Sequence, residues 1–441
     1  MNDMSPIPTI DLTVSEQAAA IANRTISPVA VMENALSRIE RLDPLLHAWA
    51  YVDAGSAREQ AIACEAEAAA GKFRGPLHGV PVGIKDVLHV EGMPTIANSR
   101  TTDPNGAAAD STVAAALRAA GAIIIGKCAT VEFAGAGDPP ETRNPWNFEH
   151  TPGGSSSGSG SAVGARMVPL AIGTQTGGSN LRPAAYCGIA GFKPGYGGLS
   201  RQGVWPLAWS LDHVGLIARS AVDLGYVYRA IAPHPLPAEA VDRPWKIGLL
   251  RQFFLEGSDA ATVAAVEKAA GLFAGKGASI AEPVLPEIFS ALKAVHRLVL
   301  STESATFHAS RLANHPDTIN PKTRATVQAF SLVPAAYYLQ AMRIRRLIRD
   351  QLLAMFDTTD ILIMPTTPSP APEGIASTGD ASFLSPWSLV GFPAATVPCG
   401  LSPEGLPIGL QIVGPPGADG RVLAAAEYAE MHLGRLSLPE I

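Results

Sequence analysis

Residues 151–167, with the sequence TPGGSSSGSGSAVGARM, decide how the rest of this chain can be arranged. Glycine and serine dominate the tract, and this composition is typical of a flexible linker between domains. A linker here would divide the chain into two separately folded parts. However, an apolar run follows the tract directly, so a second hypothesis is that some of these serines are held rigidly for chemistry.

The composition limits the classes of protein to consider. The 441 residues are 47% hydrophobic and 16% charged, which allows a large buried core and excludes a disordered chain. The net charge is −6 and no block of lysine and arginine occurs, so we expect no nucleic-acid partner. We find no signal peptide at the start and no apolar stretch of about 18 residues, and therefore expect a cytoplasmic protein without a membrane partner. The four cysteines are far apart, which favours reduced thiols.

The hydrophobic pattern alternates between helical and extended segments. Ser27 followed by Pro28 is a typical helix start, and apolar residues then recur at helical spacing. Further helices are predicted over residues 55–70, 111–120, 261–274 and much of 287–352, and strands within 76–90, 122–126, 245–250 and from 361. Alternation of this kind favours an α/β fold with a covered sheet.

Several short motifs match known functional patterns but are discounted. GAIIIGKC (121–128) nearly fits a phosphate-binding loop, although its apolar interior favours a strand and Cys128 replaces the hydroxyl that would bind magnesium. SALK (290–293) lacks the companion motifs of penicillin-binding enzymes. GSSSG (154–158) would make Ser156 a hydrolase nucleophile, but turn-like sequence precedes it. The ten histidines lack metal-ligand spacing, so no metal site is predicted.

Two further stretches leave a structural and a functional interpretation open. Lys85 lies between apolar residues in GVPVGIKDV, where it either reaches water from a strand end or is a buried amine with a lowered pKa. In GTQTGGSNLRP (173–183), a glycine pair precedes Ser179, and such a pair allows successive N–H groups to converge as in an oxyanion hole. The alternative is a tight turn followed by a surface arginine, Arg182.

Long, ordered motifs connect these stretches. They are GPLHGVPVGIKDVLHVEGMPT (75–95), GGSSSGSGSAVGARMVPLAIGTQTGGS (153–179), GIAGFKP (188–194), SLDHVGLIARS (210–220) and GFPAATVPCGLSPEGLPIGLQIVGPPGADGRVL (391–423). In these motifs the chain resembles the amidase signature family of serine hydrolases. The resemblance implies one α/β/α amidase domain over residues 1–441, with a mixed, twisted central sheet covered by helices. The implied segments are a signature core (75–224), a variable substrate-selecting region (225–385) and a C-terminal core segment (386–441).

Carried over position by position, the resemblance implies a catalytic triad of Lys85, Ser155 and Ser179. In this family the bridging serine follows a cis peptide bond. Neutral Lys85 would accept a proton from Ser155 and Ser155 one from Ser179, which would attack the amide carbonyl and form an acyl-enzyme. No metal or cofactor is implied. The residues implied to bind the substrate or the oxyanion are Gln175, Thr176, Gly177, Gly178 and Arg182.

The sequence departs from the family pattern next to the nucleophile. Many members have an aspartate where Gln175 stands and an arginine two residues after the nucleophile, whereas here Arg182 is the third. This variant is similar to the malonamidase-like branch, in which the arginine holds a substrate carboxylate. We leave open whether Arg182 binds an acidic group of the substrate or pins the helix against the loop.

The resemblance implies an amidase that hydrolyses the C–N bond of a small carboxamide to a carboxylate and ammonia or an amine. The same triad also fits a related ester or carbamate hydrolase. An alternative is the glutaminase (A) subunit of a tRNA-dependent amidotransferase, which the Gln175 and Arg182 variants and the lack of a basic stripe argue against. A binding protein that kept only the fold is disfavoured, because all three triad side chains are present. The expected partner is a small-molecule amide, with a homodimer left open.

Overall fold

The computed structural model describes residues 11–237, 239–437, 439 and 441. Its strands are β1 (Trp49–Val52), β2 (Pro81–Lys85), β3 (Ile123–Cys128), β4 (Leu170–Gln175), β5 (Ala190–Lys193), β6 (His213–Ala218), β7 (Lys246–Leu249), β8 (Ser279–Ala281), β9 (Ile361–Pro365), β10 (Ala394–Leu401) and β11 (Pro407–Val413). They form one sheet in the order β1-β3-β2-β4-β6-β5-β10-β11-β9-β7-β8. Parallel and antiparallel pairs both occur, so the sheet is mixed.

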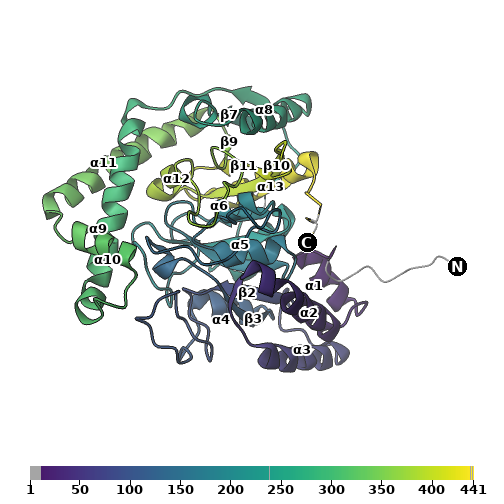
Figure 1. Ribbon diagram of the computed structural model, residues 1–441. Coiled ribbons are helices and arrows are strands. Elements are labelled where there is room, and N and C mark those ends of the chain that lie inside the picture. Colours follow the sequence, from purple (N-terminus) through teal and green to yellow (C-terminus); the bar gives the residue numbers. More distant parts are fainter. Residues whose placement is uncertain (1–10, 238, 438, 440) are drawn as a thin grey trace.

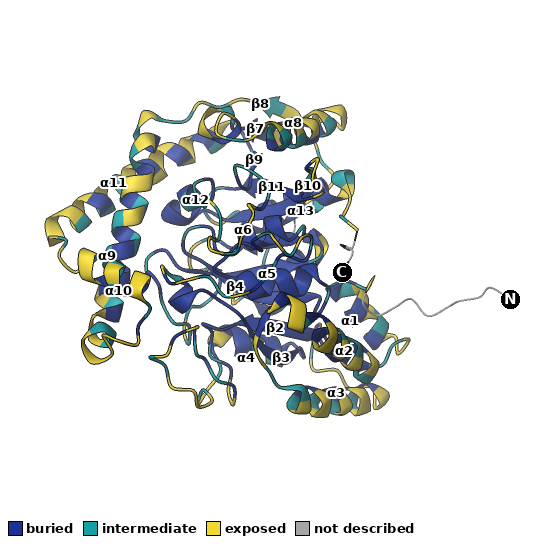
Figure 2. Cartoon of the chain, viewed as in Figure 1, coloured by how far each residue is buried: buried dark blue, intermediate teal, exposed yellow. Residues whose placement is uncertain are grey.

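Helices surround this sheet, and the buried residues concentrate along it (Figures 1 and 2). The helices are α1 (Val14–Ala22), α2 (Pro28–Leu46), α3 (Ala54–Ala69), α4 (Thr112–Ala119), α5 (Ser157–Gly164), α6 (Leu181–Tyr186), α7 (Ala221–Ile231), α8 (Ala260–Gly275), α9 (Leu292–Asn314), α10 (Pro321–Phe330), α11 (Ala335–Leu353), α12 (Ser385–Val390) and α13 (Asp419–Leu433). The predicted α/β fold with a large covered sheet is confirmed.

Several helices begin where short polar side chains can cap them. The Ser27 hydroxyl accepts hydrogen bonds from the N–H groups of Val29 and Ala30 at the start of α2, and Pro28 takes the first helical position. Asp53 caps α3 and Ser111 caps α4 in the same way. Because capping and apolar spacing agree in these segments, the helices predicted there lie within a few residues of their observed bounds.

The sheet joins segments that are far apart in the sequence. The strands of the C-terminal segment, β10 and β11, lie between β5 on one side and β9 on the other. The strands after residue 225 therefore continue the sheet that the earlier strands begin. Helices α9, α10 and α11 project at the left of Figure 1, and their outer faces are exposed in Figure 2.

The glycine- and serine-rich tract is part of the core. Every residue from 151 to 165 is buried, and its second half forms α5. Its glycines allow close packing, because a Cβ at Gly158 would collide with the backbone of Ala48 and Ala129, and one at Gly160 would lie 2.8 Å from Pro183. The linker hypothesis is therefore excluded, and the tract is a rigid layer beside the sheet.

Candidate active site

Lys85 is the last residue of β2 and is fully buried. Its Nζ lies 2.8 Å from Ser155 Oγ and 2.7 Å from Thr174 Oγ1. Among the described residues, no carboxylate forms an ion pair with it, so burial lowers the pKa of the amine well below its ordinary value. The more distant charge of Asp212 opposes this effect only in part. Lys85 does not reach water, and its environment favours the uncharged amine.

The parallel pairing of β2 with β4 explains why Lys85 meets Thr174. The carboxyl ends of parallel neighbours lie at the same edge of a sheet, and both residues are at such ends. Ser155 approaches this edge from the loop that precedes α5, and the peptide bond between Gly154 and Ser155 is cis. Three segments of the chain therefore meet at the Lys85 amine.

The loop from Thr176 to Ser179 is held from outside through its carbonyl groups. The donors are His296 Nε2 to Thr176 O (3.0 Å), Ser388 Oγ to Gly177 O (2.7 Å), Arg182 N to Gly178 O (3.0 Å) and Ser156 N to Ser179 O (3.1 Å). Across the described part of the chain, the N–H groups of Gly177, Gly178 and Ser179 have no acceptor. The loop therefore keeps several N–H groups available for a developing negative charge, as an oxyanion hole requires.

Ser179 lies at the end of this loop and is 9% exposed. Its hydroxyl has no hydrogen-bond partner among the described residues, which leaves it available to an incoming substrate. The main-chain bond from Ser156 fixes the Ser179 loop against the segment that carries Ser155. The structure thus brings Lys85 and Ser155 into direct contact and ties the neighbouring backbone to Ser179.

Asp212 anchors the other end of the loop. Its carboxylate accepts a hydrogen bond from Thr176 Oγ1 at 2.6 Å and others from the N–H groups of Leu207 and Ala208. Burial raises the pKa of Asp212 to about 6, although these donors lower it. Because its oxygens are occupied in this way, Asp212 positions the loop.

Gln175, which the resemblance places at the substrate, makes its contacts inside the protein. Its side-chain oxygen accepts hydrogen bonds from the N–H groups of Asn180 and Leu181, both at 3.0 Å, at the start of α6. Its amide nitrogen donates to Ser388 Oγ at 3.1 Å. The residue is fully buried, so in this structure Gln175 caps the helix that follows Ser179.

Arg182 is similarly engaged by the protein. Its guanidinium is almost fully buried and donates to Gly154 O, to Thr378 Oγ1 at 2.9 Å and to Gly379 O at 2.6 Å. Gly154 O belongs to the peptide group that precedes Ser155. These contacts match the hypothesis that Arg182 pins α6 against neighbouring loops.

Sequence patterns provide no reason to select Thr174, Ser388 or His296 for the site. Thr174 follows four buried residues of β4, Leu170 to Gly173, and its contact with Lys85 depends on the register between β2 and β4. His296 and Ser388 come from α9 and α12, in or next to the region where the family resemblance is weakest. Only an alignment of related sequences could have pointed to these positions.

One cluster has the residue types of a metal site. Single ligand atoms of Cys64, Glu67 and His78 lie within 4.8 Å of one another. However, the two ring nitrogens of His78 bond to the Arg74 N–H and to Cys64 O, and Glu67 forms an ion pair with Arg74. The chain therefore already engages the His78 ring and the Glu67 carboxylate, two of the three groups that would bind an ion.

The fold and the site together are those of a hydrolase that acts on amide C–N bonds. The family model described as Amidase matches residues 30–423, and the chain belongs to this family. Membership of the amidase signature family is thereby confirmed, whereas the malonamidase-like branch remains a prediction. None of the described helices has the length and apolarity needed to cross a membrane.

Curated relatives match almost the whole chain. The A subunit of the glutamyl-tRNA(Gln) amidotransferase of Roseiflexus castenholzii is 36% identical over 92% of this chain and 93% of its own length. The protein of the same name from Acidothermus cellulolyticus is 37% identical, with 97% and 96% covered. These names contradict the expectation that a chain without a basic stripe has no link to nucleic acid. The expectation used the charge of this chain alone, and in an assembly another subunit can provide the surface that contacts the nucleic acid.

Solved structures share the fold over nearly the full length. A crystal structure of an amidase has a TM-score of 0.89 and 31% identity, covering 96% of this chain and all of that one. A structure described as a vestigial protein complex that reveals the origins of an s-triazine catabolic enzyme has a TM-score of 0.87 and 30% identity, with 97% and 100% covered. A peptide amidase bound to chymostatin has a TM-score of 0.87 and 28% identity, with 99% and 100% covered.

Replacing Lys85 with methionine is expected to raise the free energy of unfolding at neutral pH. Burial lowers the pKa of the folded-state amine below the ordinary 10.5, so between these two pKa values the unfolded chain binds more protons than the folded one. Wild-type stability therefore rises with pH across this window, and the advantage of the variant shrinks until it vanishes above about 10.5. Chemical denaturation at a series of pH values measures this difference.

The matched control is Lys127, which is equally buried but lies 2.9 Å from Asp86. Lys127→Met leaves a buried carboxylate without its partner and should destabilise the protein by about 3–5 kcal/mol. Parallel stability–pH curves for wild type and Lys85→Met would contradict the uncharged amine.

Arg182→Gln is expected to reduce kcat/KM equally for an amide that carries a carboxylate and for a neutral amide of the same length. The wild-type guanidinium already bonds to Gly154 O and to the 378–379 segment, so its loss displaces the backbone beside Ser155 whatever the substrate. A misplacement of about 1 Å can cost about 10²-fold in rate. A loss confined to the acidic amide would show instead that Arg182 binds a substrate carboxylate.

Proposed function

We propose that the chain hydrolyses a small carboxamide through an acyl-enzyme on Ser179, with Ser155 and Lys85 as the proton relay. The observation that carries this proposal is the 2.8 Å contact between Lys85 Nζ and Ser155 Oγ at a fully buried amine. An uncharged amine has a lone pair that can accept the Ser155 proton, and Ser155 can then accept the proton of Ser179. A charged lysine could not begin this sequence.

The reaction proceeds in two halves. Ser179 Oγ attacks the carbonyl carbon, and the negative oxygen is stabilised by the N–H groups of the loop from Thr176 to Ser179. The proton held by the relay passes to the leaving nitrogen as the C–N bond breaks, which releases ammonia or an amine. Water then attacks the acyl-enzyme, gives up a proton to the relay and restores the Ser179 hydroxyl while the carboxylate leaves.

A second candidate is the glutaminase subunit of a tRNA-dependent amidotransferase. The names of the curated relatives favour it over the stand-alone amidase. Glutamine also carries a primary carboxamide, so the same acyl-enzyme chemistry would apply, and the ammonia would pass to a partner subunit. The residue types at Gln175 and Arg182 differ from many family members, but both side chains bond to the protein itself. They are therefore weak evidence against an amidotransferase subunit.

A fluorophosphonate probe is expected to label the wild-type protein at Ser179 and to leave Ser179→Ala unlabelled. The Ser155→Ala and Lys85→Met variants should label at least about a thousandfold more slowly, because the relay members act as a unit. Ser157→Ala is the matched control, since its buried hydroxyl has no partner among the described residues and its loss leaves the relay intact. Labelling of Ser179→Ala at the wild-type rate, located by mass spectrometry of the adduct, would place the nucleophile elsewhere.

Ammonia release distinguishes the two candidates. A stand-alone amidase should release ammonia from short carboxamides as a purified chain, at a rate that other proteins do not change. A glutaminase subunit should hydrolyse glutamine only weakly alone and at least about tenfold faster when co-purified with stoichiometric partner subunits. Full activity of the isolated chain would remove the amidotransferase candidate, and activity confined to the complex would remove the stand-alone one.

A further inference from the structure

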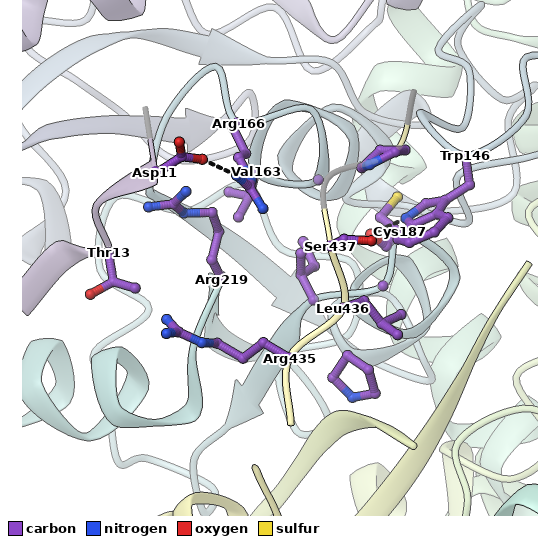
Figure 3. Close-up of a pocket in the computed structure, with 15 residues that line it drawn as sticks. Asp11, Thr13, Trp146, Val163, Arg166, Cys187, Arg219, Arg435, Leu436 and Ser437 are labelled. Carbon is purple, nitrogen blue, oxygen red and sulfur yellow. Dashed lines mark hydrogen bonds and ion pairs between the residues drawn. The ribbon is translucent and has the colours of Figure 1, made fainter. Parts of the chain in front are cut away.

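Two cavities of this chain are each lined by three arginines, and no residue of the proposed triad lines either of them. In the first, of about 270 Å³, Arg166 forms an ion pair with Asp11, as Figure 3 shows. The chain thus supplies a counter-charge for that cavity. The arginines of the second cavity are not matched in this way.

The second cavity has a volume of about 550 Å³ and lies between one face of α11 and three turns. Helix α11 contributes Arg345, Arg346 and Arg349, and Arg349 lies on the same side of the helix as the other two because it follows them by four and three residues. Arg346 and Arg349 have neither a hydrogen bond nor an ion pair to any residue that the structure describes. Two guanidinium groups therefore face this space without a counter-charge.

Arg345 is held in place by neutral acceptors. It donates to Leu389 O at 2.6 Å, to Ser210 O at 2.8 Å and to Ser210 Oγ at 3.0 Å. Burial lowers the pKa of Arg345, Glu303 opposes this effect, and the charge of Arg349 adds to it by a smaller amount. Arg345 thus brings a third guanidinium to the side of the cavity that Arg346 and Arg349 line, where a bound anion would be attracted.

One carboxylate also lines the cavity, and it is already engaged. Asp419 accepts hydrogen bonds from Gly195 N at 2.8 Å and from the Tyr228 hydroxyl at 3.4 Å. Its charge also acts on the buried Lys193, whose pKa it raises against the effect of burial. Asp419 is therefore engaged by the turn and by Tyr228, and the three arginines outnumber this single carboxylate in the lining of the cavity.

The turns opposite α11 allow a ligand to approach the backbone closely. Gly197 and Gly417 have φ values of 84° and 77°, and a Cβ at either position would meet nothing within 4 Å. In the described residues, neither N–H group has an acceptor. Glycine turns with open N–H groups next to arginines are a common arrangement for binding anions.

We propose that this cavity binds a small molecule through its phosphate group. Arg346 and Arg349 offer forked donors that match phosphate oxygens, and the turn amides add further donors. The organic part of the bound phosphate compound would lie against the apolar side of the cavity, which Tyr196, Met342 and Val390 form. A solvent-open hollow of about 550 Å³ has the size of a small-molecule site, whereas a nucleic acid needs an extended basic surface. This inference does not depend on the proposed triad.

The test is calorimetric titration of the full chain with phenyl phosphate at fixed ionic strength. Saturable binding is expected for the wild type, with affinity at least about tenfold lower in the Arg346→Gln/Arg349→Gln variant, since that variant loses the charge-assisted hydrogen bonds to the phosphate. The control variant, Arg343→Gln/Arg297→Gln, removes the same charge from positions outside the cavity and should keep wild-type affinity.

Three outcomes would overturn the proposal. They are no saturable binding of phenyl phosphate to the wild type, equal affinity in the wild type and the cavity variant, and equal losses in the cavity and control variants. Titration with unfractionated tRNA provides a further arm. Binding of tRNA that requires Arg346 and Arg349, together with no binding of phenyl phosphate, would assign these arginines to a nucleic acid.

Discussion

Burial of the Lys85 amine between two hydroxyl groups governs the chemistry that the surrounding chain can support. Within the described structure its neighbours at bonding distance are the neutral side chains of Ser155 and Thr174, so desolvation favours the uncharged form. Lys127 on the next strand shows the contrast, because Asp86 lies against it and opposes the effect of burial. One sheet edge therefore holds two buried lysines in different electrostatic environments, and the absence of a carboxylate makes Lys85 the one suited to accept a proton.

The loop from Thr176 to Ser179 is fixed by parts of the chain that the sequence separates widely. A helix of the variable region supplies His296, and the C-terminal segment supplies Ser388, which bonds both the loop and Gln175. Arg182 connects the peptide group before Ser155 to the 378–379 segment. The elements expected to select the substrate are thus bonded to the elements expected to stabilise the oxyanion. Changes in the variable region should therefore alter turnover as well as substrate binding.

Local rules account for much of the fold, and close packing accounts for what they miss. Ser27 and Pro28 determine where a helix begins, and the apolar neighbours of Lys85 already allowed a buried amine. The tract at 151–167 has the composition of a linker because its glycines permit contact with neighbouring backbone, and composition cannot distinguish tight packing from flexibility. Ser155 could be chosen among adjacent serines only through the family resemblance. The family motif around Ser179 predicts that Gln175 contacts the substrate, whereas in the structure its side chain bonds to the start of α6.

The two candidate functions share the acyl-enzyme and differ in what happens to the released ammonia. The proposed triad cannot separate them, since both would cleave a carboxamide by the same attack of Ser179. Net charge could not separate them either, because an acidic chain can belong to an assembly in which another chain contacts the nucleic acid. The two candidates must differ in the surfaces that would contact a partner subunit, and in how binding of that subunit would change the conformation of the loop at Thr176. Helix α12 offers a physical route, since Ser388 bonds that loop while α12 packs against α9 and α11 on the exposed side of the molecule.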